Sequence, residues 1–304
     1  MEAQITKDIL KKVRQIEVRT HRLVNDSLAG NYHSVFKGSG MNFEEVRAYV
    51  PGDDIRTIDW NVTARTGLLH IKKFNEEREL TIMLLIDISG SGDFGSGSIS
   101  KRELMAELGS LLAFSAVRNN DKVGLILFSD HVELYIPAKK GRSHILRVIR
   151  EILFFKAQGI RTDICGPLDF LNRINKRRCV AFLISDFCLP GNFQDSLQQL
   201  QPKLKISNRR HDLVAMHISD PRELELPDVG WINLEDAETG EQIELNTSAA
   251  QVRESFATLA RARKTGLHQT IRAAGIDLLD LATDRAYLPA LLGFFGARRL
   301  RRTR

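Results

Sequence analysis

Blocks of continuous apolar residues alternate with helically periodic stretches along most of the chain. The continuous blocks predict strands at 81–89, 122–129, 132–136, 179–185, 212–219 and 276–281. Helices are predicted between them at 101–118, 142–155, 164–175, 193–205 and 249–273. Strands that are apolar throughout are buried on both faces, which is typical of a parallel sheet covered by helices. The pattern therefore predicts an α/β fold with a doubly wound, mostly parallel sheet.

Two regions depart from this alternation. Ile5, Ile9, Val13 and Ile16 recur at helical spacing and predict an N-terminal helix within residues 5–28. Residues 40–78 lack a long periodicity, which indicates a small β-rich subdomain of short strands and turns.

A hairpin is also predicted late in the chain. Ile232 and Leu234 alternate with polar residues before the turn Glu238-Thr239-Gly240, and Ile243 and Leu245 continue the alternation after it. We expect this hairpin to be a surface insertion. The predicted organisation is residues 1–78 as the helix and β-rich segment, 79–296 as the main α/β domain, and 297–304 as a basic tail.

The charge of the chain is concentrated at its C-terminal end. The net charge is +6 over 304 residues, and five arginines lie in the last seven positions, namely Arg298, Arg299, Arg301, Arg302 and Arg304. Such a tail suits nucleic acid or anionic lipid. A dispersed basic groove with aromatic residues is not evident, so nucleic acid is not the expected partner. Contact of the tail with a membrane surface stays open as an alternative.

The remaining composition predicts the compartment. An apolar content of 43% is enough for a sizeable core. No run approaches the ~18 to 20 apolar residues of a membrane span, and the first residues lack a basic region followed by an apolar one. We therefore expect a cytoplasmic protein, whose three cysteines are reduced thiols.

Oxygen-bearing side chains follow two of the predicted strands. Asp87, Ser89 and Ser91 lie in one turn after the first apolar strand, and Asp186 closes the strand at 179–185. Thr162 precedes a predicted helix. In doubly wound sheets, ligands bind beyond the carboxyl ends of the strands. Because these are hard oxygen donors, the sequence predicts a Mg²⁺ site at that edge.

The pattern Asp-x-Ser-x-Ser with a distant Thr and a distant Asp resembles the metal-ion-dependent adhesion site of von Willebrand factor A domains. The matching positions are Asp87, Ser89, Ser91, Thr162 and Asp186. The resemblance implies a von Willebrand factor A-like fold and a hydrated Mg²⁺, with Mn²⁺ or Ca²⁺ as alternatives. An acidic residue of a partner would complete the coordination. Gly92 departs from the Met that many members have, but no ligand is lost.

A second stretch, Glu45 to Asn61, resembles the signature of the bacterial domain of unknown function 58 family. Together the two motifs cover about residues 35 to 190. The resemblance implies an adaptor, chaperone-like in action, for a MoxR-type AAA+ ATPase and an unknown client protein. Pro51-Gly52-Asp53-Asp54 is good turn chemistry, and Trp60 suits burial as an anchor. We therefore expect structural roles for the signature residues Asp53, Asp54, Arg56, Asp59 and Trp60.

The sequence lacks the motifs of the enzyme classes that use a similar fold. The glycine-rich residues 90–97 lack the Gly-Lys-Ser/Thr of a phosphate-binding loop. No nucleophile elbow or histidine triad pattern is present. We therefore expect a protein without enzymatic activity. The alternatives are a metal-dependent hydrolase, such as a phosphoesterase, that uses Asp87 and Asp186, and a scaffold that acts through the arginine tail.

Overall fold

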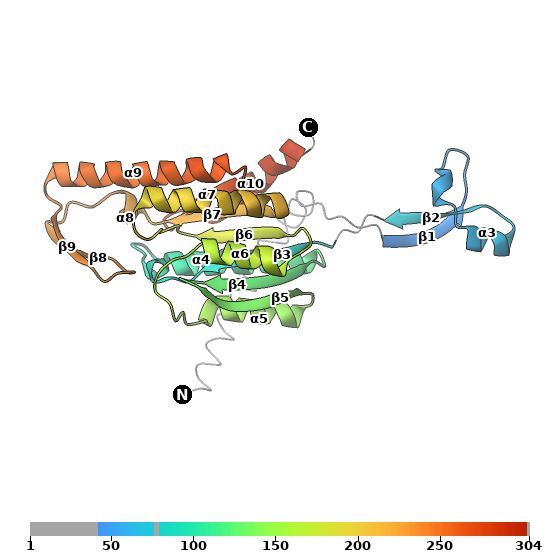
Figure 1. The fold of residues 1–304 in the computed structure, drawn as a ribbon, viewed down its shortest axis with the longest axis horizontal. Coiled ribbons are helices and arrows are strands. Elements are labelled where there is room, and N and C mark those ends of the chain that lie inside the picture. Colours follow the sequence, from blue (N-terminus) through green and yellow to red (C-terminus); the bar gives the residue numbers. More distant parts are fainter. Residues whose placement is uncertain (1–41, 76–78, 303–304) are drawn as a thin grey trace, which may run out of the picture. The chain divides into compact units, whose positions relative to one another are not determined.

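The computed structural model describes residues 42–75 and 79–302 (Figure 1). The chain divides into two compact units, residues 37–80 and the remainder, and each is described by itself. The N-terminal helix predicted within residues 5–28 lies outside the described residues.

The larger unit is built on a six-stranded sheet. Its strands are β3 (Thr81–Asp87), β4 (Lys122–Phe128), β5 (Val132–Lys139), β6 (Val180–Ser185), β7 (Asp212–Ser219) and β10 (Asp277–Ala282). Their order is β10-β7-β6-β3-β4-β5, and only the edge strand β5 is antiparallel. The doubly wound, mostly parallel sheet of a von Willebrand factor A-like fold, predicted from the sequence, is confirmed.

Helices cover both faces of this sheet. They are α4 (Lys101–Arg118), α5 (Arg142–Phe154), α6 (Cys165–Ile174), α7 (Phe193–Arg210), α8 (Pro221–Leu224), α9 (Ala250–Ala273) and α10 (Tyr287–Arg302). Met83 and Leu85 of β3 belong to a core shared with α6, α7 and α9. Ile86 points the opposite way, toward Gly109 of α4. Alternate residues of one apolar strand thus fill two cores, which explains why its sequence is continuously apolar.

The start of α4 is fixed by local sequence. Ser100 caps the helix by accepting a hydrogen bond from the Glu103 amide, and the Glu103 carboxylate accepts one from the Ser100 amide. This reciprocal arrangement satisfies two amides that a helix start leaves unpaired. It places Lys101 at the first helical position, directed at the carboxyl end of the sheet.

The basic tail predicted at 297–304 is wrong in its first part. Residues 297–302 are the last turns of α10, and Arg298 is buried. Its guanidinium pairs with Asp212 and lies 3.4 Å from Asp277, and Arg301 lies 2.9 Å from Asp277. The prediction failed because a run of arginines gives no indication of partly buried carboxylates at the starts of distant strands.

A two-stranded hairpin lies outside the main sheet. It consists of β8 (Trp231–Glu235) and β9 (Gln242–Asn246), which pair antiparallel. In the turn, the Asp236 carboxylate accepts hydrogen bonds from the amides of Glu238 and Thr239. Gly240 has a φ of 72°, a conformation that favours glycine. The hairpin predicted from the alternating pattern is therefore present, and its turn is held by local bonds.

The smaller unit contains the signature residues. It consists of β1 (Asn42–Ala48) and β2 (His70–Asn75), paired antiparallel, with a 3-10 turn at Ile55–Thr57 and α3 (Trp60–Thr66). Asp59 caps α3 through the amides of Asn61 and Val62.

The other signature residues of this unit differ in exposure. The Asp53 carboxylate binds the Arg47 guanidinium at 2.7 and 2.9 Å, and Asp54 caps the 3-10 turn through the Arg56 amide. Trp60 is 66% exposed, so the burial expected for it is wrong. As the first residue of α3, Trp60 is directed outward from the small unit while its neighbour Asp59 is buried.

Candidate metal site at the carboxyl ends of the strands

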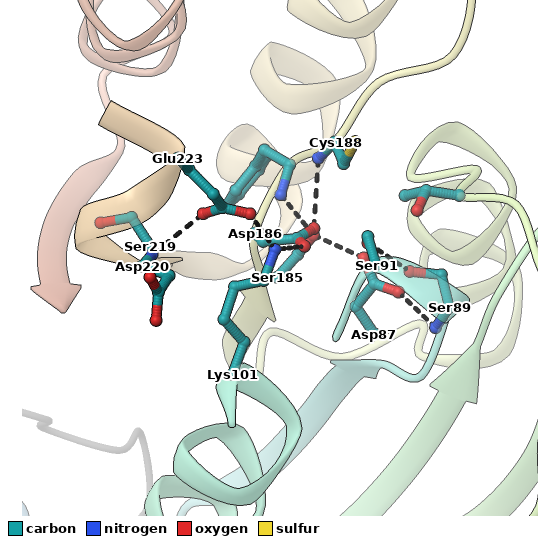
Figure 2. A network of polar contacts seen from close by, with 12 residues as sticks. Asp87, Ser89, Ser91, Lys101, Ser185, Asp186, Cys188, Ser219, Asp220 and Glu223 are labelled. Carbon is teal, nitrogen blue, oxygen red and sulfur yellow. Dashed lines mark hydrogen bonds and ion pairs between the residues drawn. The ribbon is translucent and has the colours of Figure 1, made fainter. Parts of the chain in front are cut away.

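The predicted oxygen cluster forms where β3 and β6 end side by side. These strands pair in parallel, with Ile86 opposite Ile184, so Asp87 and Asp186 emerge at the same edge. Asp87 is almost fully buried: one carboxylate oxygen accepts a hydrogen bond from the Ser89 amide at 2.9 Å, and the other accepts one from the Ser185 hydroxyl at 2.6 Å. Figure 2 shows this carboxylate between its neighbours. Its orientation is thereby fixed.

The hydroxyls of Ser89 and Ser91 form the second part of the cluster. Both residues are buried, and their Oγ atoms lie 3.1 Å apart. Two adjacent ligands of an octahedral Mg²⁺ at 2.0 to 2.1 Å lie about 2.8 to 3.0 Å from each other. The hydroxyl pair therefore has a spacing that fits one ion. Arg102 supports the turn from behind by donating to the Ile88 and Ser89 carbonyls.

A buried lysine lies beside Asp186. The Lys101 Nζ atom is 2.6 Å from Asp186 Oδ2 and also binds Glu223, while Asp186 Oδ1 accepts a hydrogen bond from the Cys188 amide (Figure 2). Burial alone would lower the pKa of Lys101, but the Asp186 and Glu223 carboxylates raise it above its usual range. Lys101 is therefore a charged ammonium shared by two carboxylates.

The cluster has an excess of negative charge near Asp87. Burial, followed by repulsion from Asp186, raises the pKa of Asp87 to about 7. Among the described residues, no lysine or arginine forms an ion pair with Asp87 or with Glu238. A buried carboxylate in that position is stabilised by a cation. The donor set, with carboxylates and hydroxyls at suitable spacing, fits a hard divalent ion.

Thr162 joins the cluster through a residue of the hairpin. Thr162 is buried in the loop before α6, and its hydroxyl donates a hydrogen bond of 2.6 Å to Glu238, in the turn between β8 and β9. Burial raises the pKa of Glu238, and the bond from Thr162 opposes that rise; repulsion from Asp186 adds to it. Since Asp186 acts on both Asp87 and Glu238, the structure brings the five predicted ligand residues to one edge of the sheet. The five signature residues lie in the other unit.

Three functional residues were missed by the sequence analysis. Lys101 is 85 residues from Asp186, and Glu238 is 76 residues from Thr162. The third, Ser185, directly precedes Asp186 and binds Asp87. Only Ser185 has a local signal, because a hydroxyl at the end of a buried strand needs a polar partner.

A second group of ligand-type side chains lies on β7, α9 and β10. His217 Nδ1 is 2.9 Å from Asp280 Oδ1 and 3.2 Å from His268 Nε2. The Lys264 ammonium lies 2.7 Å from the other Asp280 oxygen. These groups satisfy one another as a hydrogen-bond network, and the adjacent ammonium disfavours a cation. We therefore assign this group a structural role.

Comparisons with known proteins agree with the motifs. The family model described as "Protein of unknown function DUF58" matches residues 45–266. The chain belongs to this family. An uncharacterized protein of Mycobacterium tuberculosis, Rv1480, is 34% identical over 289 residues, which cover 94% of this chain and 89% of that protein.

Solved structures with a similar fold are distant in sequence. One, titled an aerotolerance-related membrane protein from Bacteroides fragilis, has a TM-score of 0.47 and 16% identity, and covers 73% of this chain and 99% of that chain. The SpRpn10 VWA domain has a TM-score of 0.40 and 14% identity, and the match covers 70% of this chain and 94% of that chain.

The first of these titles contradicts the cytoplasmic location predicted from the sequence, and that prediction is corrected. That prediction rested on the lack of an apolar span and of a basic region followed by an apolar one. In the described part of the chain, no helix combines the length and apolar character needed to cross a membrane.

Proposed function

We propose that the chain is a protein-interaction module that binds an acidic side chain of its partner through a divalent cation. The single observation that carries this proposal is the buried hydroxyl pair of Ser89 and Ser91, 3.1 Å apart beside carboxylates that exceed the available cationic charge. Hydroxyl oxygens beside carboxylates are the kind of donor that a hard cation prefers.

The proposed ligands divide by their charge. Ser89, Ser91 and Thr162 supply neutral oxygens, while Asp87 and Asp186 are held by hydrogen bonds and act directly or through ordered water. When bound, Mg²⁺ supplies positive charge that an anionic oxygen neutralises better than water does. Because the Lys101 ammonium is shared by Asp186 and Glu223, Asp87 is the proposed ligand that has no lysine or arginine partner among the described residues. Its single charge compensates half of a dication, which favours a further carboxylate from the partner. Mn²⁺ suits the same donors, as does Ca²⁺ at longer distances.

The proposed partner class rests on a resemblance. The resemblance to proteins encoded beside MoxR-type AAA+ ATPases supports an adaptor role, in which the chain links such an ATPase to a client during assembly or maturation. We further propose that the chain has no turnover of its own. Near Asp87 and Asp186, the described residues offer no serine or cysteine paired with a histidine base.

A capture experiment tests this function. The purified chain is immobilised and offered a purified MoxR-type ATPase from the same genome, in Mg²⁺ and in EDTA. We expect retention in Mg²⁺, release by EDTA, and loss of binding in Ser89→Ala. Ser96→Ala is the control, since Ser96 binds Asp220 rather than the cluster. Equal retention in Mg²⁺ and in EDTA would contradict the proposal.

A further inference from the structure

We propose that this chain carries its own carboxylate for the metal site: Glu238, presented by the β8–β9 hairpin, occupies the position that a partner's acidic residue takes. The inference rests on the proposed function. It makes the hairpin an internal ligand that an acidic partner segment has to displace.

The exposure of the turn singles out Glu238. Residues 236–240 are exposed except Glu238, which is half-buried against the cluster. Its carboxylate accepts the hydrogen bond of Thr162, one of the proposed ligands, at 2.6 Å. A glutamate in a surface turn ordinarily extends into water, because burying its charge is costly. Its inward direction therefore indicates an interaction at the cluster.

The turn is also in close contact with the loop that carries the serines. A Cβ atom on Gly90 would lie 2.9 Å from the carbonyl oxygen of Ala237. Gly90 lies between Ser89 and Ser91, and its φ is not in the left-handed region, so backbone freedom does not explain the glycine there. Close packing explains it: the hairpin carbonyl is the nearest atom, and the Ile160 Cγ2 atom would lie 3.1 Å from the same Cβ. A side chain at position 90 would push the turn away from the site.

The hairpin is anchored at both ends of its turn and at its base. The Asp236 amide donates to the Glu241 carbonyl, and the Gly240 amide donates to the Asp236 carbonyl. At the base, the buried Thr247 hydroxyl donates to the Gly230 carbonyl and accepts from the Val229 amide. Glu238 is thus presented by a pre-formed turn, which lowers the entropy cost of placing it at the site.

Charge explains how the internal ligand can be exchanged. Glu238 is repelled by Asp186, and Lys101 is already engaged by Asp186 and Glu223. In the described part of the chain, the hydrogen bond from the Thr162 hydroxyl is the side-chain contact that holds the Glu238 carboxylate. The divalent ion would therefore bind Glu238 at its open position. A partner segment with an exposed Glu or Asp in a tight turn offers the same group and can replace it.

The test uses Mn²⁺ as a probe of the full-length chain and follows water-proton relaxation. We compare wild type, Glu238→Ala and the matched control Glu241→Gln, an exposed glutamate of the same turn. We expect Glu238→Ala to bind Mn²⁺ at least about tenfold more weakly and to show a larger relaxation enhancement, because water replaces the carboxylate. Added acetate should reduce that enhancement in Glu238→Ala and leave wild type unchanged. Glu241→Gln should behave as wild type.

Two other outcomes separate the two proposals. If Glu238→Ala has wild-type Mn²⁺ affinity and relaxation, while Asp87→Asn loses the ion, then Glu238 does not contact the metal. The internal-ligand proposal then fails and the metal site stands. If wild type itself binds no Mn²⁺, the proposed function fails and this inference fails with it.

Discussion

The hydroxyl of Thr162 donates a hydrogen bond of 2.6 Å to the carboxylate of Glu238, 76 residues away in the sequence. This bond joins the loop before α6 to the turn of the β8–β9 hairpin. It changes the interpretation of the hairpin from a surface insertion to a part of the candidate site. It also means that the predicted ligand Thr162 already has an acidic partner within the same chain.

The hairpin contact can be tested without changing a ligand. Gly90→Ala places a methyl group 2.9 Å from the Ala237 carbonyl, a clash that costs about 1 to 3 kcal/mol unless the turn moves. We expect faster hydrogen exchange at residues 236–241. Gly97→Ala is the control, because a Cβ there meets nothing within 4 Å. Unchanged exchange in Gly90→Ala would show that the turn does not rest on this loop.

The metal-free protein should lose stability as pH rises through about 7. The pKa of Asp87 is raised to about 7 in the folded chain from 3.8, so the folded state binds more protons than the unfolded state between these values. Stability then falls with rising pH, by at most about 1.4 kcal/mol per unit in that window. Asp87→Asn should flatten this dependence, and Mg²⁺ should remove it in wild type. Thermal unfolding from pH 5 to 8 measures both, and a pH profile identical in wild type and Asp87→Asn would contradict the assignment.

The C-terminal arginines differ in their contribution to stability. Arg298→Ala removes a buried guanidinium that pairs with Asp212 and lies 3.4 Å from Asp277, and it should cost about 3 kcal/mol, because two partly buried carboxylates lose a cationic partner. Arg299→Ala, at an exposed position of the same helix, should cost less than about 1 kcal/mol. Urea unfolding of the two variants measures both losses of unfolding free energy. Equal losses would show that Arg298 is solvated like the rest of a basic tail.

The absence of turnover is a prediction open to direct assay. Phosphate monoesters and diesters, nucleotides and peptides are offered to the purified chain with Mg²⁺ and with Mn²⁺. We expect rates no higher than without protein, because no activated nucleophile accompanies the oxygen cluster. A Mg²⁺-dependent rate that is lost in Asp186→Ala, and kept in the surface variant Asp169→Asn, would favour the hydrolase alternative.

Much of the fold could be predicted because its signals are local. The strand from Thr81 to Asp87 is apolar throughout and therefore buried on both faces, and α4 begins where Ser100 and Glu103 cap each other. The hairpin followed from alternation on either side of a glycine turn. These features depend on periodicity and caps, which a single sequence shows.

The candidate site could be predicted only in part, for a physical reason. Asp87, Ser89 and Ser91 share one turn, and Asp186 ends a strand, so their positions follow from the sheet. Lys101 and Glu238 reach the site from a helix start and a hairpin tip, and their placement depends on packing between distant segments. The arginine run was likewise misjudged, because the carboxylates that bind Arg298 lie at the starts of β7 and β10.

Calorimetric titration with Mg²⁺ and Mn²⁺ measures directly whether this oxygen cluster binds a divalent cation. Wild type, Asp87→Asn and the control Asp169→Asn, an exposed carboxylate that pairs with Lys203 on the surface, are titrated at pH 8, above the pKa of Asp87. We expect one site in wild type and in Asp169→Asn, and none in Asp87→Asn, with all three proteins folded by circular dichroism. Equal affinity in Asp87→Asn and wild type, or no binding in wild type, would contradict the proposed metal site.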